Sequence, residues 1–121
     1  RVSWEEVKVA YMSHDIFMFC SLRDSSAAQF LEAMAYGLPV ITLNLHGARN
    51  LVPDKAGIKV EVQDPEITTR ELSQGVEKLY KNPNLRIAMG KQGYTFAKTQ
   101  TWPIKTGIVN EYYQQLLSRN S

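Results

Sequence analysis

Two short apolar runs constrain the fold of this 121-residue chain more than any other feature. Residues 16–20 read Ile-Phe-Met-Phe-Cys, and residues 39–44 are also nearly all apolar. Neither run alternates apolar with polar residues, as a strand with one solvated face does. Both runs are therefore predicted to be strands of a parallel sheet that is buried on both faces. Residues 58–62 are predicted to form a third strand.

Helical patterns precede and separate the first two strands. Residues 3–6 read Ser-Trp-Glu-Glu, the form of a capping box, which predicts a helix up to about residue 13. A second helix is predicted from about Ala27, because apolar side chains follow it at helical spacing. Gly37 suits the left-handed position after a helix, and Pro39 prevents the helix from continuing.

The segment between the second and third strands is predicted to be a loop that carries His46, Gly47 and Pro53. Three further helices are predicted after the third strand. They begin at a second capping box (Thr68 to Glu71), at Asn82-Pro83-Asn84 and at Trp102-Pro103, and the first two end near Tyr80 and Lys98. The last carries Ile108, Tyr112 and Leu116 on one face.

This order of elements predicts an α/β fold with right-handed crossovers. We expect a Rossmann-like, three-layer α/β/α arrangement with a parallel sheet and C-terminal helices, in one domain over residues 1–121. Three strands make a thin sheet, which suggests part of a larger domain. Ligands of open α/β sheets bind at the carboxyl ends of the strands. A site is therefore expected at the loop over residues 21–26.

The residues of that loop suit a ligand that carries both phosphate and hydroxyl groups. Asp24 and Glu32 stand at the two ends of a small-residue segment, and a carboxylate accepts hydrogen bonds from sugar hydroxyls. The small residues between them are Ser25, Ser26, Ala27 and Ala28. They allow close approach to the first N–H groups of a helix, which favour an anion.

Spacing alone leaves a second interpretation open. Asp24, Ser25 or Ser26 is also a common helix N-cap, and Glu32 then is a surface residue of the helix.

Residues 21–60 resemble the donor-binding segment of retaining glycosyltransferases of the GT-B fold, in glycosyltransferase family 4 (glycosyl transferases group 1). The family pattern has a serine after a strand, a glutamate, seven residues, a second glutamate, and then Ala-Met-Ala-x-Gly-x-Pro-Val-Ile. Residues 32–35 and 37–41 match its second half, and Gly47 matches the glycine of the next loop. The resemblance extends over essentially the whole chain.

The resemblance implies roles for the matching residues. Glu32 is expected to hold the ribose hydroxyls of a nucleotide-sugar, and Asp24 to face hydroxyls of the transferred sugar. Backbone amides around residues 25–28 are expected to meet the sugar or the diphosphate. His46 and Arg49 are candidates for contact with the ligand, although a loop histidine is often structural or solvated. The family needs no metal ion or other cofactor.

Three positions depart from the family pattern. Asp24 replaces a glutamate, Ala27 replaces a glycine, and Asn50 replaces a glutamate. Together they indicate a variant subfamily, or else a decayed site. In the family, the arginine and lysine that neutralise the diphosphate and the acceptor-binding domain both lie upstream of the matching segment. Because glycosyl transfer needs stabilisation of the leaving group, the chain alone is expected to be inactive.

Charge and composition limit the other functions. Residues 1–77 carry 7 basic and 11 acidic side chains, and residues 78–121 carry 7 basic and 1 acidic. These basic residues are spread along helical patterns, so we expect solvated helix faces and no nucleic-acid binding. No segment has the roughly 20 apolar residues of a membrane span. The single cysteine, Cys20, suits the cytoplasm and is expected to be buried. His14 and His46 are too far apart in sequence to suggest a metal site.

Three functions compete. The first is the donor-binding part of a retaining glycosyltransferase, whose partners are a nucleotide-sugar and a sugar, polysaccharide or lipid-linked acceptor held by a missing domain. That parent is expected in the cytoplasm, with the membrane surface as an alternative. The second is a nucleotide-sugar epimerase or hydrolase of the same fold. The third is a non-catalytic scaffold, a reading that Asp24 favours.

Overall fold

A computed structural model describes residues 2–23 and 28–119. The helices are α1 (Trp4–Ser13), α2 (Ala28–Ala35), α3 (His46–Leu51), α4 (Pro65–Lys81), α5 (Pro83–Lys98) and α6 (Trp102–Arg119). The strands are β1 (Phe17–Phe19), β2 (Val40–Leu43) and β3 (Gly57–Val60). All strand pairs are parallel, in the order β1-β2-β3, with Val40 opposite both Phe17 and Gly57.

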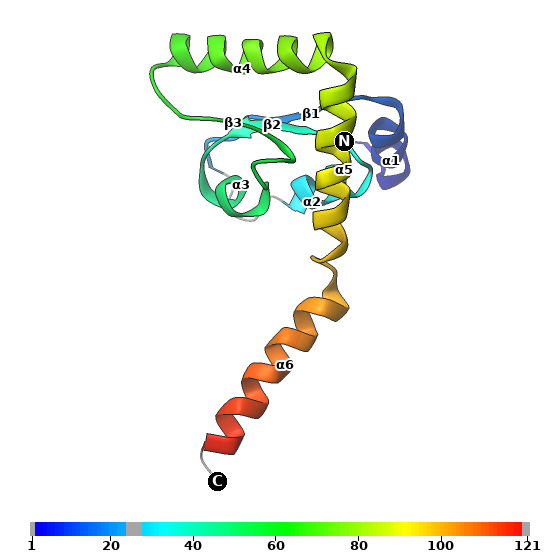
Figure 1. The fold of residues 1–121 in the computed structure, drawn as a ribbon, viewed down its shortest axis with the longest axis vertical. Coiled ribbons are helices and arrows are strands. Elements are labelled where there is room, and N and C mark those ends of the chain that lie inside the picture. Colours follow the sequence, from blue (N-terminus) through cyan, green and yellow to red (C-terminus); the bar gives the residue numbers. More distant parts are fainter. Residues whose placement is uncertain (1, 24–27, 120–121) are drawn as a thin grey trace.

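Helices cover both faces of this sheet (Figure 1). Helix α4 lies on one face, where Ile41 and Leu43 of β2 pack with Leu72 and Leu79. On the other face, Val40 of β2 packs with side chains of α2, of α3 and of the segment that follows α3. These side chains are Phe30, Met34, Ala48, Val52 and Ala56. The predicted three-layer α/β/α arrangement is confirmed.

Helix α5 crosses the end of the sheet and packs on α2 (Figure 1). Its glycines allow this close contact, because a Cβ on Gly93 would approach the Met34 side chain and one on Gly90 would overlap the Gly37 carbonyl. Gly37 itself has a φ of +74°, as predicted for the residue that ends α2. The helix that carries Glu32 is therefore held at its C-terminal end by α5.

Helix α6 extends away from the rest of the chain (Figure 1). No residue of Trp102–Arg119 is buried, and Trp102 is 83% exposed. The predicted apolar face of Ile108, Tyr112 and Leu116 exists, and all three side chains are exposed. Among the described residues, no helix is both long and apolar enough to span a membrane.

The structure confirms one predicted helix start and corrects another. Ser3 and Glu6 form the capping box at the start of α1. The predicted capping box at Thr68 is wrong, because α4 begins earlier, at Pro65. The Asp64 side chain caps it by accepting from the backbone N–H groups of Glu66 and Ile67.

Three other expectations are wrong. The segment predicted as a loop after β2 contains the short helix α3, which has no side-chain N-cap and therefore no recognisable start signal. The run at residues 16–20 is not buried on both faces, because β1 is an edge strand in which Met18 is 46% exposed and no residue is buried. Cys20, directly after this strand, is likewise exposed. The partial burial of this thiol raises its pKa above the usual value.

Candidate functional site

The predicted ligand-binding residues fall into two groups. Asp24, Ser25, Ser26 and Ala27 lie outside the described residues. Ala28, Glu32 and His46 are described, and all three follow the carboxyl ends of strands. Ala28 is exposed at the start of α2, Glu32 is half-buried one turn further along, and His46 begins α3 directly after β2. The predicted location of a ligand at this edge stays a prediction.

The sheet edge below these residues is filled. The Thr42 hydroxyl donates to the Phe19 carbonyl oxygen at 2.7 Å and joins the ends of β1 and β2. The hollow there measures only about 10 Å³ and is lined by Phe19, Ser21, Phe30, Thr42, Leu43, Leu45 and Ala48. This hollow is too small for a ligand. A ligand at this edge would therefore bind above these side chains, and residues other than these would have to enclose it.

The carboxylate of Glu32 is not simply a solvated side chain. Its Oε2 accepts a hydrogen bond of 3.1 Å from the hydroxyl of Tyr11, a buried residue of α1. Sequence reasoning missed this partner. The apolar spacing of α1 is compatible with an inward-facing Tyr11, but no local pattern pairs two residues that are 21 positions apart. Glu32 thus has a defined orientation before any ligand binds.

His46 has an unusual backbone conformation. Its φ is +44°, in the left-handed region that side chains other than glycine rarely adopt. Its Nε2 lies 3.1 Å from the Leu22 carbonyl oxygen, so the imidazole connects the segment after β1 to the start of α3. Strained residues of this kind gather at functional sites. The contact of His46 is structural, and its predicted contact with a ligand stays a prediction.

Polar groups at the end of β2 are largely occupied by one another. Arg49 donates to the Asn44 carbonyl oxygen at 3.1 Å, and the Asn44 side-chain amide donates to Glu61. Lys59 forms a salt bridge of 2.8 Å with Asp54 and thereby holds the pKa of that carboxyl below its usual value. The Asn44 Oδ1 is buried without a hydrogen-bond partner. Among the described residues of this edge, Arg49 and Lys59 are thus both engaged with other groups of the chain, and Asn44 Oδ1 is an acceptor without a partner.

No three histidine, cysteine, aspartate or glutamate side chains within residues 2–23 and 28–119 lie close enough to share a metal ion.

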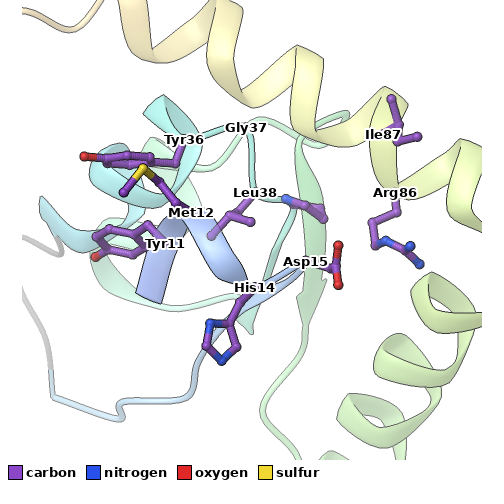
Figure 2. A pocket seen from close by; sticks show the side chains of 10 residues that line it. Tyr11, Met12, His14, Asp15, Tyr36, Gly37, Leu38, Arg86 and Ile87 are labelled. Atoms are coloured by element: carbon purple, nitrogen blue, oxygen red, sulfur yellow. The ribbon is translucent and has the colours of Figure 1, made fainter. Parts of the chain in front are cut away.

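A larger cavity, of about 330 Å³, lies at the opposite edge of the sheet (Figure 2). It is lined by Tyr11, Met12, His14, Asp15, Tyr36, Gly37, Leu38, Pro39, Arg86 and Ile87. Pro39 directly precedes β2, and Asp15 lies two residues before the start of β1, so the cavity faces the amino ends of the strands. Parallel sheets bind ligands at their carboxyl ends, and this cavity is not the predicted site. It does show the packing of Tyr11 beside Tyr36 (Figure 2).

The family model described as "Glycosyl transferases group 1" matches residues 1–96. Two similar curated proteins are D-inositol 3-phosphate glycosyltransferases. The protein of Paenarthrobacter aurescens (strain TC1) is 28% identical over 109 residues, and that of Corynebacterium jeikeium (strain K411) is 29% identical over 113 residues. These matches cover 89% and 93% of the chain but 26% of each relative. The chain thus spans about a quarter of the length of these relatives.

A solved structure has the same fold. The sucrose-phosphate synthase of Thermosynechococcus elongatus superposes with a TM-score of 0.80 and 23% sequence identity, over 98% of this chain and 29% of that protein. The parallel sheet and its helices match the Rossmann-like domain of the GT-B fold.

Proposed function

The chain belongs to the glycosyl transferases group 1, and from this membership we propose that it binds the nucleotide-sugar of a glycosyltransferase that acts with retention. Residues 1–121 are then part of the C-terminal, donor-binding domain of a longer protein. The extent of the matches supports this division, since the chain aligns with 26% of the length of the D-inositol 3-phosphate glycosyltransferases.

The observation that carries the proposal is the position of Glu32. It lies on the helix that follows β1, inside the segment that the family model matches, and its half-buried side chain is already oriented by Tyr11. A carboxylate in this place is suited to accept two hydrogen bonds from the neighbouring hydroxyls of a ribose. We assign ribose binding to Glu32 and contact with the transferred sugar to Asp24. Backbone amides of residues 25–28 would meet the sugar or the diphosphate.

Cations from outside this chain are proposed to take part in binding the diphosphate. A departing nucleoside diphosphate carries charge that must be stabilised in the transition state. Among the described residues near the carboxyl ends of the strands, Arg49 and Lys59 are engaged with the chain itself, and Arg23 after β1 is exposed. We propose that the longer protein supplies the cations for the diphosphate, without a metal ion, and also the binding site for a sugar, polysaccharide or lipid-linked acceptor. We further propose a cytoplasmic location.

The test uses the full-length protein that carries these residues. It is incubated with uridine, guanosine and adenosine diphosphate sugars, and the release of free nucleoside diphosphate is measured. Release from one donor is expected, and Glu32→Gln and Asp24→Asn should each lower kcat/KM by roughly ten-fold or more, since each weakens charge-assisted hydrogen bonds. Glu66→Gln is the matched control, because Glu66 is exposed on α4.

Other outcomes support other functions. Absence of both binding and release for every donor would favour a non-catalytic scaffold. Conversion of the donor into its epimer without net release would favour an epimerase, and release together with a free sugar but no acceptor product would favour a hydrolase. An acceptor product with inverted anomeric configuration would contradict retention.

A further inference from the structure

A buried tyrosine of α1 holds the carboxylate to which ribose binding is assigned. The Tyr11 hydroxyl donates to Glu32 Oε2 at 3.1 Å. The two residues belong to different helices, and β1 lies between them in the sequence. The hydrogen bond therefore fixes the orientation of Glu32 relative to a separate element and not merely to its own helix.

The ring of Tyr11 has little freedom to move. Only 8% of the residue is exposed. Its ring stacks on Tyr36 with the centroids 5.4 Å apart, and it lies 5.9 Å from the ring of Phe17 at an angle of 59°. Ala33 and Leu38 complete the cluster around it. In Figure 2 the rings of Tyr11 and Tyr36 lie one above the other, with both hydroxyls on the same side. The position of the Tyr11 oxygen is thus set by core packing.

The Tyr11 hydroxyl stays protonated and can therefore always donate its hydrogen bond to Glu32. Burial raises the pKa of Tyr11 to about 12, and the hydrogen bond to Glu32 and the charge of that carboxylate add to the effect. The hydroxyl therefore keeps its proton at physiological pH. A carboxylate offers about four lone-pair positions, so one bond from Tyr11 leaves acceptor capacity for the two hydroxyls of a ribose.

We propose that Tyr11 is a positioning residue, which holds Glu32 in the orientation that accepts the ribose hydroxyls of the donor. The inference rests on the proposed function. A glutamate side chain has three rotatable bonds, and ordering it during binding weakens affinity. The bond from Tyr11 orders it in advance. Tyr11 acts through Glu32 and does not touch the ligand.

Tyr36 provides the matched control. It stacks on the same ring as part of the same cluster, but within the described residues its hydroxyl makes no hydrogen bond to Glu32. Tyr36→Phe and Tyr11→Phe thus remove the same atom from neighbouring rings. Only the second change frees the carboxylate.

The experiment is a double-mutant cycle on the full-length protein. Dissociation constants and steady-state kinetics are measured with the panel of uridine, guanosine and adenosine diphosphate sugars, for Tyr11→Phe, Tyr36→Phe, Glu32→Ala and the Tyr11→Phe/Glu32→Ala double variant. Loss of one hydrogen bond to a charged group should raise Kd and KM of the donor about three- to ten-fold in Tyr11→Phe, with kcat nearly unchanged. In the Glu32→Ala background the same change should have no further effect.

Several results would overturn the inference while sparing the proposed function. One is a weaker donor affinity in Glu32→Ala but wild-type affinity in Tyr11→Phe. Another is an equal loss in Tyr36→Phe, and a third is an undiminished effect of Tyr11→Phe when Glu32 is absent, since both indicate general damage to packing. A Glu32→Ala variant with wild-type donor affinity would instead contradict the ribose assignment itself.

Discussion

Replacing Gly90 with alanine is expected to disrupt the packing of α5 on the turn after α2. An ideal Cβ on Gly90 would lie 3.0 Å from the carbonyl carbon of Gly37 and nearer still to its oxygen, whereas ordinary Cβ contacts begin at 3.4 Å. The obstacle is backbone, held by the positive φ of Gly37. The helices must therefore separate, because no side chain can rotate out of the way.

Two opposing effects determine how much Gly90→Ala changes the free energy of unfolding. Overpacking of a close contact costs up to about 3 kcal/mol, and alanine is favoured over glycine in a helix by about 1 kcal/mol. Gly90→Ala should thus lower the free energy of unfolding by about 2 kcal/mol. Gly107 of α6 is the control, because a Cβ there would have nothing within 4 Å. Gly107→Ala should leave stability unchanged or raise it by up to about 1 kcal/mol.

The assay is urea unfolding followed by far-UV circular dichroism. For a domain of this size the loss corresponds to a midpoint lower by about 1 M urea at constant slope. Equal midpoints for Gly90→Ala and Gly107→Ala would refute this account of how α5 holds α2.

Three further predictions concern single residues. Because the pKa of Tyr11 is raised from the ordinary tyrosine value of 10.0 to about 12, its contribution to stability is complete below pH 10 and is lost as the pH rises towards 12. Between pH 10 and 12, the free energy of unfolding should therefore fall less steeply with pH in Tyr11→Phe than in the exposed control Tyr112→Phe. The same pH dependence of the free energy of unfolding in both variants would contradict this. His46→Gly should be more stable than His46→Ala by about 1 kcal/mol in urea unfolding, since only glycine relieves the positive φ; the reverse order would be evidence against backbone strain. Asp64→Ala should lower the free energy of unfolding by about 1 kcal/mol through loss of the α4 cap, and an unchanged urea midpoint would show that Asp64 adds nothing.

Local signals predicted the fold well where one interaction decided the structure. The capping box at Ser3 needs only four residues, and the turn at Gly37 needs only one backbone conformation. At α4 two cap-like signals competed. Asp64 is the N-cap of α4, and Pro65 is its first residue. The Thr68 hydroxyl does not cap the helix and instead accepts from the Gln63 backbone N–H.

Other features depend on contacts that no short pattern contains. Helix α3 is six residues long and begins at a residue with positive φ, so its segment resembled a loop. Cys20 and Met18 are exposed because β1 lies at the edge of the sheet, a position that the apolar run itself does not reveal. Sequence reasoning identified Glu32 as a candidate, but its partner Tyr11 comes from a helix that precedes β1. Glu32 could thus be named as a candidate from the sequence, and its contact with a ligand stays a prediction, whereas the hydrogen bond that orients it could not be predicted.

The central claim is that Glu32 accepts hydrogen bonds from the ribose of a nucleotide-sugar. The most direct measurement compares the affinity of the full-length protein for its donor and for the 2′-deoxyribose form of that donor, in the wild type and in Glu32→Ala. The wild type should prefer the ribose form by roughly ten-fold, as expected for a hydrogen bond to a charged group, and Glu32→Ala should lose this preference. An equal preference in both proteins would contradict the claim, because the 2′-hydroxyl would then be recognised by another residue.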